Sequence, residues 1–172
     1  MEKELILPGG QELKKGYEFT FGTWDNDPID WLVLKVNKGD VLCISKYLLD
    51  RHRFDLESND WYKSELRHWL NSDFLSKAFS DEEKSFILPY KGDKISLLSS
   101  NEAKRVFLTN SDRSAKVKNE IYDSYWLRTP GSWPYGVESI EYYGRISIFG
   151  DYIKLAVHVR PLLLLDKKAF TR

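Results

Sequence analysis

The amino-acid sequence predicts an α+β domain in which early and late strands enclose a group of short helices. Three observations carry this prediction. β-branched and aromatic residues dominate the first third, helix-capping patterns occur in the middle, and short apolar segments separated by Gly or Pro fill the last third. The order of elements is therefore sheet, helices, sheet, which is typical of α+β proteins.

The first strands are expected in the segments 17–22 (YEFTFG), 29–36 (IDWLVLKV) and 41–45 (VLCIS). A short loop with Gly39 separates the last two and predicts a hairpin, because glycine takes positive φ without steric cost. The sequence DND, from Asp25 to Asp27, is similar to part of a calcium loop, but the glycine and the distal glutamate are missing and Pro28 follows. We therefore expect a turn there.

A helix is expected from Asp60 onward. The residues that share one face of this helix, by their spacing of i, i+4, i+7 and i+8, are Tyr62, Leu66, Trp69 and Leu70. Asn59 or Asp60 would cap its start, and Asn71 would suit its end.

Two further helices are expected at capping boxes. Ser80 precedes Glu83 by three residues, and Ser99 precedes Glu102 by three, so each pair can satisfy two backbone N–H groups. The segment 94–99 (KISLLS) between them is a predicted strand, and residues 110–121 are expected to form a loop or a frayed helix. Late strands are expected within residues 124–128, 136–142, 145–149 and 155–165.

Composition indicates one soluble domain, residues 1–172, with a full hydrophobic core. Lys and Arg number 26 and Asp and Glu number 26, so no net field favours nucleic acid, although a local basic patch would be compatible with this balance.

The longest apolar run, 155–165, is about half the ~20 residues of a membrane span. Residues 1–10 carry no signal-peptide pattern, so we expect a cytoplasmic protein. Cys43 lies in an apolar run and is expected to be buried, without an intrachain disulfide.

The sequence contains no common catalytic or metal-binding motif. It has no G-x-S-x-G elbow, no glycine-rich phosphate loop and no H-E-x-x-H helix. Its three histidines, His52, His68 and His158, are scattered without the spacing of metal ligands. We therefore expect no catalytic residue, no metal and no cofactor.

Two arginines follow apolar strands directly and precede a proline, Arg128 in WLRTP and Arg160 in HVRP. Either guanidinium could bind a carboxylate or phosphate ligand with two parallel hydrogen bonds. The favoured alternative is a structural clamp, in which each arginine bonds backbone carbonyls or an acidic residue such as Asp30, Asp93 or Glu102.

Aromatic residues gather in the turn-rich segment 130–143, namely Trp133, Tyr135, Tyr142 and Tyr143. Exposed rings on such a loop can stack on sugars or anchor a protein partner. They can equally fold back over the edge of the core. The remaining tryptophans that we expect in the core are Trp31, Trp61, Trp69 and Trp126.

Three motifs in this order resemble a bacterial domain family of unknown function. The helix motif W-x-x-S-x-L-R-x-W-L-N is matched by Trp61, Ser64, Leu66, Arg67, Trp69, Leu70 and Asn71. The strand motif W-L-R-[ST]-P is matched by Trp126, Leu127, Arg128 and Pro130, and the terminal V-R-P by Val159, Arg160 and Pro161. The resemblance covers most of the chain, with a core at about residues 17–166.

That family is more distantly similar to the C-type-lectin-like fold of formylglycine-generating enzymes. The resemblance implies an early β-hairpin and a terminal strand that frame a mostly antiparallel sheet, with two to four short helices between them and a loop region that presents a ligand surface. We expect structural roles for Arg67, Trp69, Trp126 and Arg160, and the resemblance adds a cell-surface role by analogy. The enzymes use a pair of cysteines and calcium-dependent lectins use specific loops, and this sequence has one cysteine and neither loop.

The combined interpretation is a non-catalytic binding module whose aromatic loop face contacts a protein or a carbohydrate. The residues expected to bind the ligand are Arg128, Trp133, Tyr135, Tyr142 and His158. The alternative is an enzyme with a site near Arg128 and His158, because strand alternation places His158 and Arg160 on one face. A third interpretation is a scaffold that dimerises through the aromatic surface.

Overall fold

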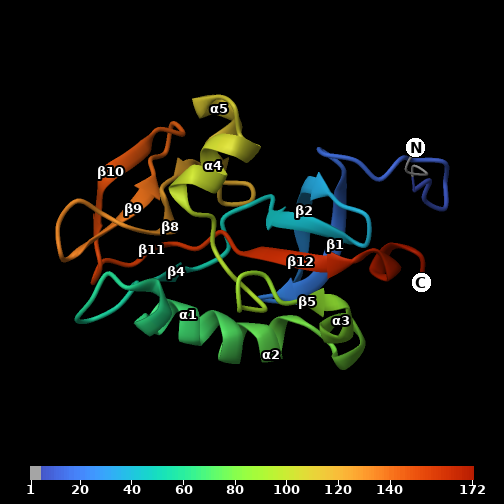
Figure 1. Ribbon diagram of the computed structural model, residues 1–172, viewed down its shortest axis with the longest axis horizontal. Helices are drawn as coiled ribbons and strands as arrows, with labels where there is room; N and C mark the ends of the chain where they lie inside the picture. Colours follow the sequence, from blue (N-terminus) through green and yellow to red (C-terminus); the bar gives the residue numbers. More distant parts are fainter. Residues whose placement is uncertain (1–4) are drawn as a thin grey trace.

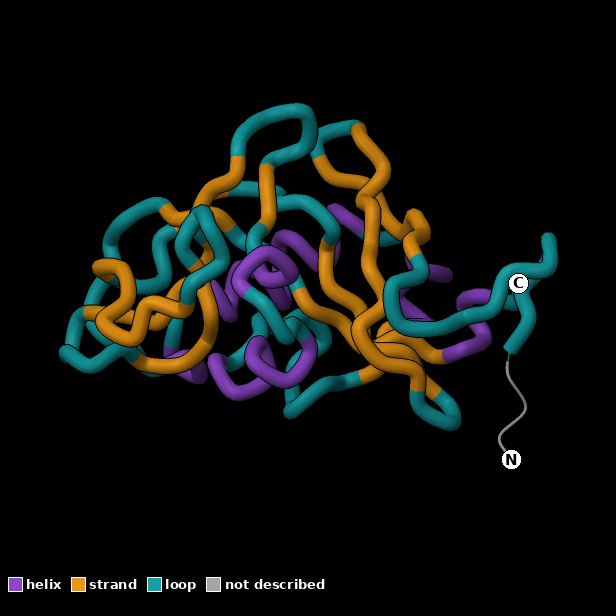
Figure 2. Tube along the Cα trace, turned by 90° about the horizontal axis from the view of Figure 1, so that it is seen from above, coloured by secondary structure: helices purple, strands orange, loops and turns teal. Residues whose placement is uncertain are grey.

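The computed structural model describes residues 5–172, and its strands lie at both ends of the long axis of the molecule (Figures 1 and 2). The first sheet has five strands in the order β1-β2-β3-β12-β5, all paired antiparallel. Its strands are β1 (Glu18–Trp24), β2 (Asp27–Val36), β3 (Asp40–Ser45), β12 (Leu162–Asp166) and β5 (Ile87–Leu88). The expected early hairpin, β2 and β3, therefore lies beside the terminal strand.

The second sheet also has five strands, in the order β10-β9-β8-β11-β4. Its strands are β10 (Ile146–Tyr152), β9 (Gly136–Ile140), β8 (Tyr125–Pro130), β11 (Val157–His158) and β4 (Arg51–His52). Only the short contact of β11 with β8 is parallel. A two-stranded ribbon, β6 (Ala115–Lys116) with β7 (Tyr122–Asp123), completes the described strands. The prediction of a mostly antiparallel α+β fold is confirmed.

The apolar run 155–165 is shared between the two sheets. β11 belongs to the second sheet and β12 to the first, and the chain passes from one to the other at Arg160 and Pro161 (Figure 1). Pro161 has no N–H to continue a ladder, but its carbonyl accepts from the backbone of Ser45. A segment that reads as one continuous strand in the sequence thus joins the two sheets.

All helices except the C-terminal turn η3 lie between the early and the late strands in the sequence. They are η1 (Trp61–Lys63), α1 (Glu65–Trp69), η2 (Leu70–Phe74), α2 (Leu75–Ala78), α3 (Asp81–Phe86), α4 (Ser100–Val106), α5 (Asn110–Arg113) and η3 (Lys167–Phe170). α1, the π-helical turn η2 and α2 run on without a break, along one side of the molecule in Figure 1. Both expected capping boxes are present, at the starts of α3 and α4.

Two local predictions are wrong. Tyr62 was expected on the buried helix face but is 62% exposed, because it belongs to the separate turn η1, while Ser64 caps α1. Residues 94–99 form no strand, and only Ser96 forms a bridge, with Leu162. The amide of Asn71 explains this difference, since it takes the backbone N–H groups of Lys94 and Ile95 that a strand partner would need.

Two other local predictions are confirmed. Asp25 and Asn26 both have positive φ, 49° and 66°, and make the two-residue turn between β1 and β2. Cys43 is fully buried, and burial raises the pKa of its thiol well above the usual range. No helix among residues 5–172 combines the length and apolar character that crossing a bilayer demands.

The core consists of two clusters of buried side chains. The larger cluster joins the first sheet to the helical run from α1 to α2 and includes Trp31, Trp61 and Trp126. The smaller one lies under α4. Trp69 is half-buried and packs its ring against His52, with ring centroids 4.8 Å apart. All four tryptophans expected in the core thus contact it.

Candidate functional site

Four aromatic rings form a cluster on the second sheet, which we call the aromatic platform: Trp133, Tyr135, Phe149 and Tyr152. Trp133 lies at its centre, with its ring stacked against Phe149 at 5.3 Å and against Tyr152 at 5.9 Å between centroids. Tyr135 meets Trp133 edge to face at 6.1 Å. Such offset and edge contacts are the arrangements that aromatic quadrupoles favour.

The backbone fixes the central ring. The Trp133 indole rests on Gly136, where an added Cβ would lie 2.0 Å from Nε1, so any other residue would displace the ring. Nε1 donates to the Phe149 carbonyl at 3.1 Å. The Asn59 amide, from the segment before η1, donates to the carbonyls of Trp133 and Gly136 at 3.3 and 3.2 Å. The platform is therefore preorganised.

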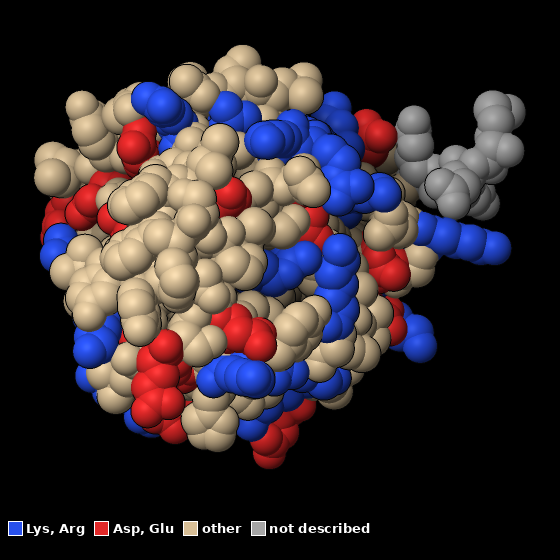
Figure 3. Space-filling model, turned by 60° about the vertical axis from the view of Figure 1, so that its left-hand side comes forward, with Lys and Arg blue, Asp and Glu red and all other residues tan. Residues whose placement is uncertain are grey.

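The outer rings are open to solvent. Tyr135 is 50% exposed, Phe149 61% and Tyr152 36%, and two aliphatic neighbours in sequence, Ile148 and Leu155, are 65% and 51% exposed. β10 is an edge strand of the second sheet, so nothing in the described chain pairs with its outer side. Figure 3 turns this end of the molecule forward and shows a broad uncharged area with charged side chains around it.

Tyr142 lies apart from the platform. Tyr142 and Tyr143 occupy the turn after β9 and contact each other edge to face at 4.8 Å. In the β9–β10 register Gly136 pairs with Tyr152 and Ile140 with Ile146, so Trp133 and Tyr142 lie at opposite ends of this hairpin. The structure thus separates Tyr142 from Trp133 and Tyr135.

Arg128 points towards α4. Its Nη1 donates to the Leu97 carbonyl at 2.8 Å and to the Glu102 carboxylate. Glu102 also accepts from the Tyr90 hydroxyl and pairs with Lys91 at 3.3 Å. Glu102 was one of the acidic partners considered for a clamp, and the contacts are those that a clamp requires.

Arg160 is 4% exposed and lies between two rings. Its guanidinium carbon is 5.3 Å from the Phe107 ring and 5.2 Å from the Tyr125 ring. Nε donates to the Ser45 carbonyl at 2.8 Å and Nη1 to the Tyr125 hydroxyl at 3.1 Å. These contacts join the first sheet to β8 of the second.

His158 is buried, and each of its ring nitrogens lies near a charged side chain. Nδ1 is 3.3 Å from the Asp123 carboxylate, and Nε2 accepts from Arg51 at 3.4 Å. Burial lowers the pKa of His158, and the nearby Asp123 opposes that shift. Because Arg128 pairs with Glu102 and His158 with Asp123, the structure does not bring the two together around one carboxylate. Arg160 bonds Ser45 and Tyr125 instead, so it shares no hydrogen-bond partner with His158.

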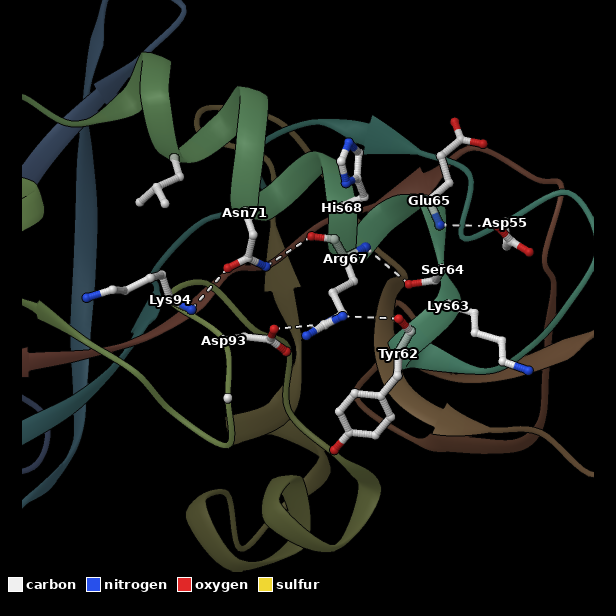
Figure 4. A pocket seen from close by; sticks show the side chains of 12 residues that line it. Asp55, Tyr62, Lys63, Ser64, Glu65, Arg67, His68, Asn71, Asp93 and Lys94 are labelled. Atoms are coloured by element: carbon white, nitrogen blue, oxygen red, sulfur yellow. Dashed lines mark hydrogen bonds and ion pairs between the residues drawn. The ribbon is translucent and has the colours of Figure 1, made fainter.

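Side chains of the helix motif connect α1 to the loop before α4 through hydrogen bonds and an ion pair, as Figure 4 shows. Arg67 Nε donates to Asp93 at 2.7 Å, and Trp61 Nε1 donates to the other oxygen of Asp93 at 3.1 Å. Asn71 bonds backbone groups of residues 94 and 95, as described above. A polar groove of about 670 Å³ opens beside these residues, and Arg67 and Asp93 pair with each other in its wall.

Phe149 and Tyr152 were not among the expected site residues. Phe149 ends the segment 145–149, which was expected only as a strand, and Tyr152 lies beyond that segment, at the end of β10. The signal that could have indicated them is Gly150, at φ 80°, which marks a bulge between Ser147 and Asp151. A bulge re-aims side chains, and here it lies between the two rings that flank Trp133.

A family model described as a domain of unknown function (DUF6273) matches residues 38–102. The matched segment contains the helix motif with Asp93 and Glu102, and it excludes the platform, Arg128 and Arg160. No curated protein and no solved structure matches the chain. The expected resemblance to a family of unknown function is therefore supported for this segment, and no relative supplies an activity.

Proposed function

We propose that this protein is a non-catalytic binding module that contacts a protein partner through the aromatic platform. The observation that carries the proposal is the exposure of Tyr135, Phe149 and Tyr152 around a fixed Trp133. Trp and Tyr are enriched among residues that dominate binding energy, because they bury a large area with few rotatable bonds. A preorganised set of rings also loses little conformational entropy on binding.

A protein surface fits the platform better than a carbohydrate. Exposed Ile148 and Leu155 extend the rings with aliphatic surface, and aliphatic side chains offer a sugar no hydrogen bonds. Asp151 and Lys154 flank Tyr152 in sequence and supply charge at the margin, as in the polar rim of an interface. A carbohydrate is the second ligand class, and the experiment below distinguishes it from a protein.

The test compares two tyrosines of equal exposure. Tyr135 in the platform is 50% exposed and Tyr122 in β7 is 51% exposed, so Tyr122→Ala is the matched control for Tyr135→Ala. Phe149→Ala removes a second platform ring. Affinity capture, a glycan array and light scattering would be run on each variant, with melting curves to verify the fold.

A captured protein that is lost with Tyr135→Ala and Phe149→Ala, and retained with Tyr122→Ala, supports the proposal. If a glycan is bound by wild type and lost in the same pattern, the ligand of the platform is a carbohydrate. If a dimer dissociates in that pattern, the partner is a second copy of this chain. Ligands that survive both platform variants would overturn the assignment of this surface.

The enzyme alternative has less support. Arg128 bonds Glu102, whereas His158 lies beside Asp123 and its Nε2 lone pair accepts from Arg51. A general base needs a free lone pair within reach of its substrate. Activity that disappears with His158→Gln while the melting temperature is unchanged would restore this alternative.

We further propose a C-type-lectin-like arrangement for the domain and a cytoplasmic location. The first is supported by the pairing of the early hairpin, β2 and β3, with the terminal strand β12. An experimental structure compared with lectin-like domains tests the arrangement, and cell fractionation tests the location.

A further inference from the structure

A groove far from the platform runs between α4 and the face of the first sheet, and we call it the α4 groove. It consists of two adjoining cavities of about 430 and 290 Å³ that share Lys15, Leu34 and Val106 in their walls. Cavities of this size are typical of small-molecule sites.

The floor of the α4 groove is aliphatic. Leu34 of β2, Leu42 of β3 and Leu164 of β12 line the larger cavity, and Val106 of α4 closes one side. Leu34 and Leu42 are buried, at 3% and 7% exposed, so the sheet holds this floor rigidly. The smaller cavity continues the apolar surface to Leu108, which is 81% exposed. An extended apolar chain would remove this surface from water.

The rim of the larger cavity is cationic. It carries Lys15, Lys35, Lys91 and Arg105 against a single carboxylate, Glu102. Glu102 is 4% exposed and pairs with Arg128 and with Lys91, so it offsets the charge of Lys91 but not that of the other rim cations. Within residues 5–172, Lys35 and Arg105 form no ion pair. The chain as a whole has no net charge, and this rim is therefore a local concentration of positive charge.

Two cations of the rim contact other residues that line the groove. The Lys15 ammonium donates to the Val106 carbonyl at 2.7 Å, and the Lys91 ammonium lies over the Tyr90 ring at 5.8 Å. Like charges around one cleft repel each other and raise the local concentration of anions. An anion bound between them would relieve this repulsion.

We propose that the α4 groove binds a monocarboxylate with an aliphatic chain of medium length. The chain would lie on the leucine floor, and the carboxylate would lie between Lys35 and Arg105. This assignment is independent of the platform, which involves the other sheet and other side chains.

The first test varies the ligand. Decanoate, decanol and decylamine share one chain length and differ in the charge of the head group, so calorimetric titration with each separates the roles of chain and charge. We expect decanoate to bind at least about tenfold more tightly than the other two. Amide resonances of Leu34, Leu42, Val106 and Leu164 should shift in the nitrogen–proton spectrum. No binding of decanoate, equal binding of decanol, or shifts confined to another region would each overturn the proposal.

The second test varies the protein. The double variant Lys35→Glu/Arg105→Glu reverses two rim charges, and Lys77→Glu/Lys168→Glu reverses two charges at exposed positions outside the groove and the platform. We expect the first to weaken decanoate binding about tenfold or more and the second to leave it unchanged. If the charge-reversal variant does not fold, Lys35→Gln/Arg105→Gln replaces it. Equal affinity in the folded groove and control variants would overturn the assignment.

Discussion

The guanidinium of Arg128, on β8, bonds the carboxylate of Glu102, on α4, and the two side chains are only 12% and 5% exposed. This pair explains why an arginine follows an apolar strand segment, because its partner Glu102 lies in the first turn of the helix that packs on that strand. Glu102 has a second role in the same place, since it completes the capping box with Ser99. Sheet and helix are thus connected through one buried carboxylate.

Removing the cation should destabilise the protein. Arg128→Ala leaves Glu102 buried with only Tyr90, Lys91 and a backbone N–H as partners, and breaking a buried pair costs about 3–5 kcal/mol. We expect about 3 kcal/mol, a fall of roughly 6–12 °C in melting temperature. Arg128→Met combined with Glu102→Gln should lose less than Arg128→Met alone, because no charge is left unpaired. An unchanged melting temperature in Arg128→Ala would contradict the clamp.

Because of Glu102, the free energy of unfolding should depend on pH in the acidic range. Burial raises its pKa, but the hydrogen bonds from Arg128, the Ser99 backbone and Tyr90 outweigh burial and bring the pKa from 4.5 down to about 2. Because the folded pKa lies below the unfolded one, this stabilisation is complete above about pH 5 and is lost as pH falls towards 2. The ionised Glu102 carboxylate contributes about 3 kcal/mol to the free energy of unfolding in this way.

Urea unfolding at a series of pH values measures this dependence. Glu102→Gln should flatten the curve between pH 5 and 2, whereas the same change at the exposed Glu57 should preserve the wild-type slope. Parallel curves for wild type and Glu102→Gln would show that the carboxylate is not held in its ionised form.

Arg160 should tolerate lysine poorly. Its planar guanidinium lies between Phe107 and Tyr125 while donating to Ser45, and a single ammonium cannot reproduce both the stacking and the spread of donors. We expect Arg160→Lys to cost about 2 kcal/mol or more in free energy of unfolding, since buried acceptors lose their donors. At Lys168, an exposed position, the change to Arg should be neutral in the same denaturant titration. Equal stability of Arg160→Lys and wild type would argue against the stacked geometry.

Glu138 should have the opposite pH behaviour to Glu102. It is 9% exposed, one of its carboxylate oxygens has no hydrogen-bond partner within the described chain, and burial raises its pKa above 4.5 despite the opposing charge of Lys104. The favourable contribution of the neutral carboxyl is complete below the unfolded pKa and is lost as pH rises through the folded pKa.

Glu138→Gln should therefore be more stable than wild type at neutral pH, and the difference should shrink towards pH 4. Thermal melts at pH 4 and pH 7 measure it, with Glu57→Gln as the exposed control. A variant that is less stable than wild type at pH 7 would mean that the ionised carboxylate has a partner that favours it.

The local elements follow closely from the sequence. Each capping box, the turn at Asp25 and Asn26, and the hairpin around Gly39 depend on residues a few positions apart, so the chain specifies them without help from distant segments. The hairpin forms without the positive φ expected at Gly39, and bonds from Asn37 to Asp40 close its turn. One of the two errors arises because a distant group intervenes. Asn71 takes the backbone donors of residues 94 and 95 and thereby prevents the strand that the apolar pattern predicts.

The candidate site was only partly predictable. Trp133 and Tyr135 were recognised because aromatic residues in a turn-rich segment are conspicuous in the sequence. Phe149 and Tyr152 join them only through the pairing of β9 with β10 and the bulge at Gly150. The same pairing moves Tyr142 to the far end of the hairpin, although it is close to Tyr135 in sequence.

The sequence by itself determined the α+β class, the order of the elements, most strand segments and the helix caps, because these depend on short-range periodicity and backbone chemistry. Only the tertiary structure decided the division into two sheets at Arg160 and Pro161, the partners of both arginines, the four-ring platform and the cationic rim over a leucine floor. Each of these arises from contacts between residues far apart in the chain. Hydrophobic burial is not directional, so such contacts are set by how complete elements pack against one another.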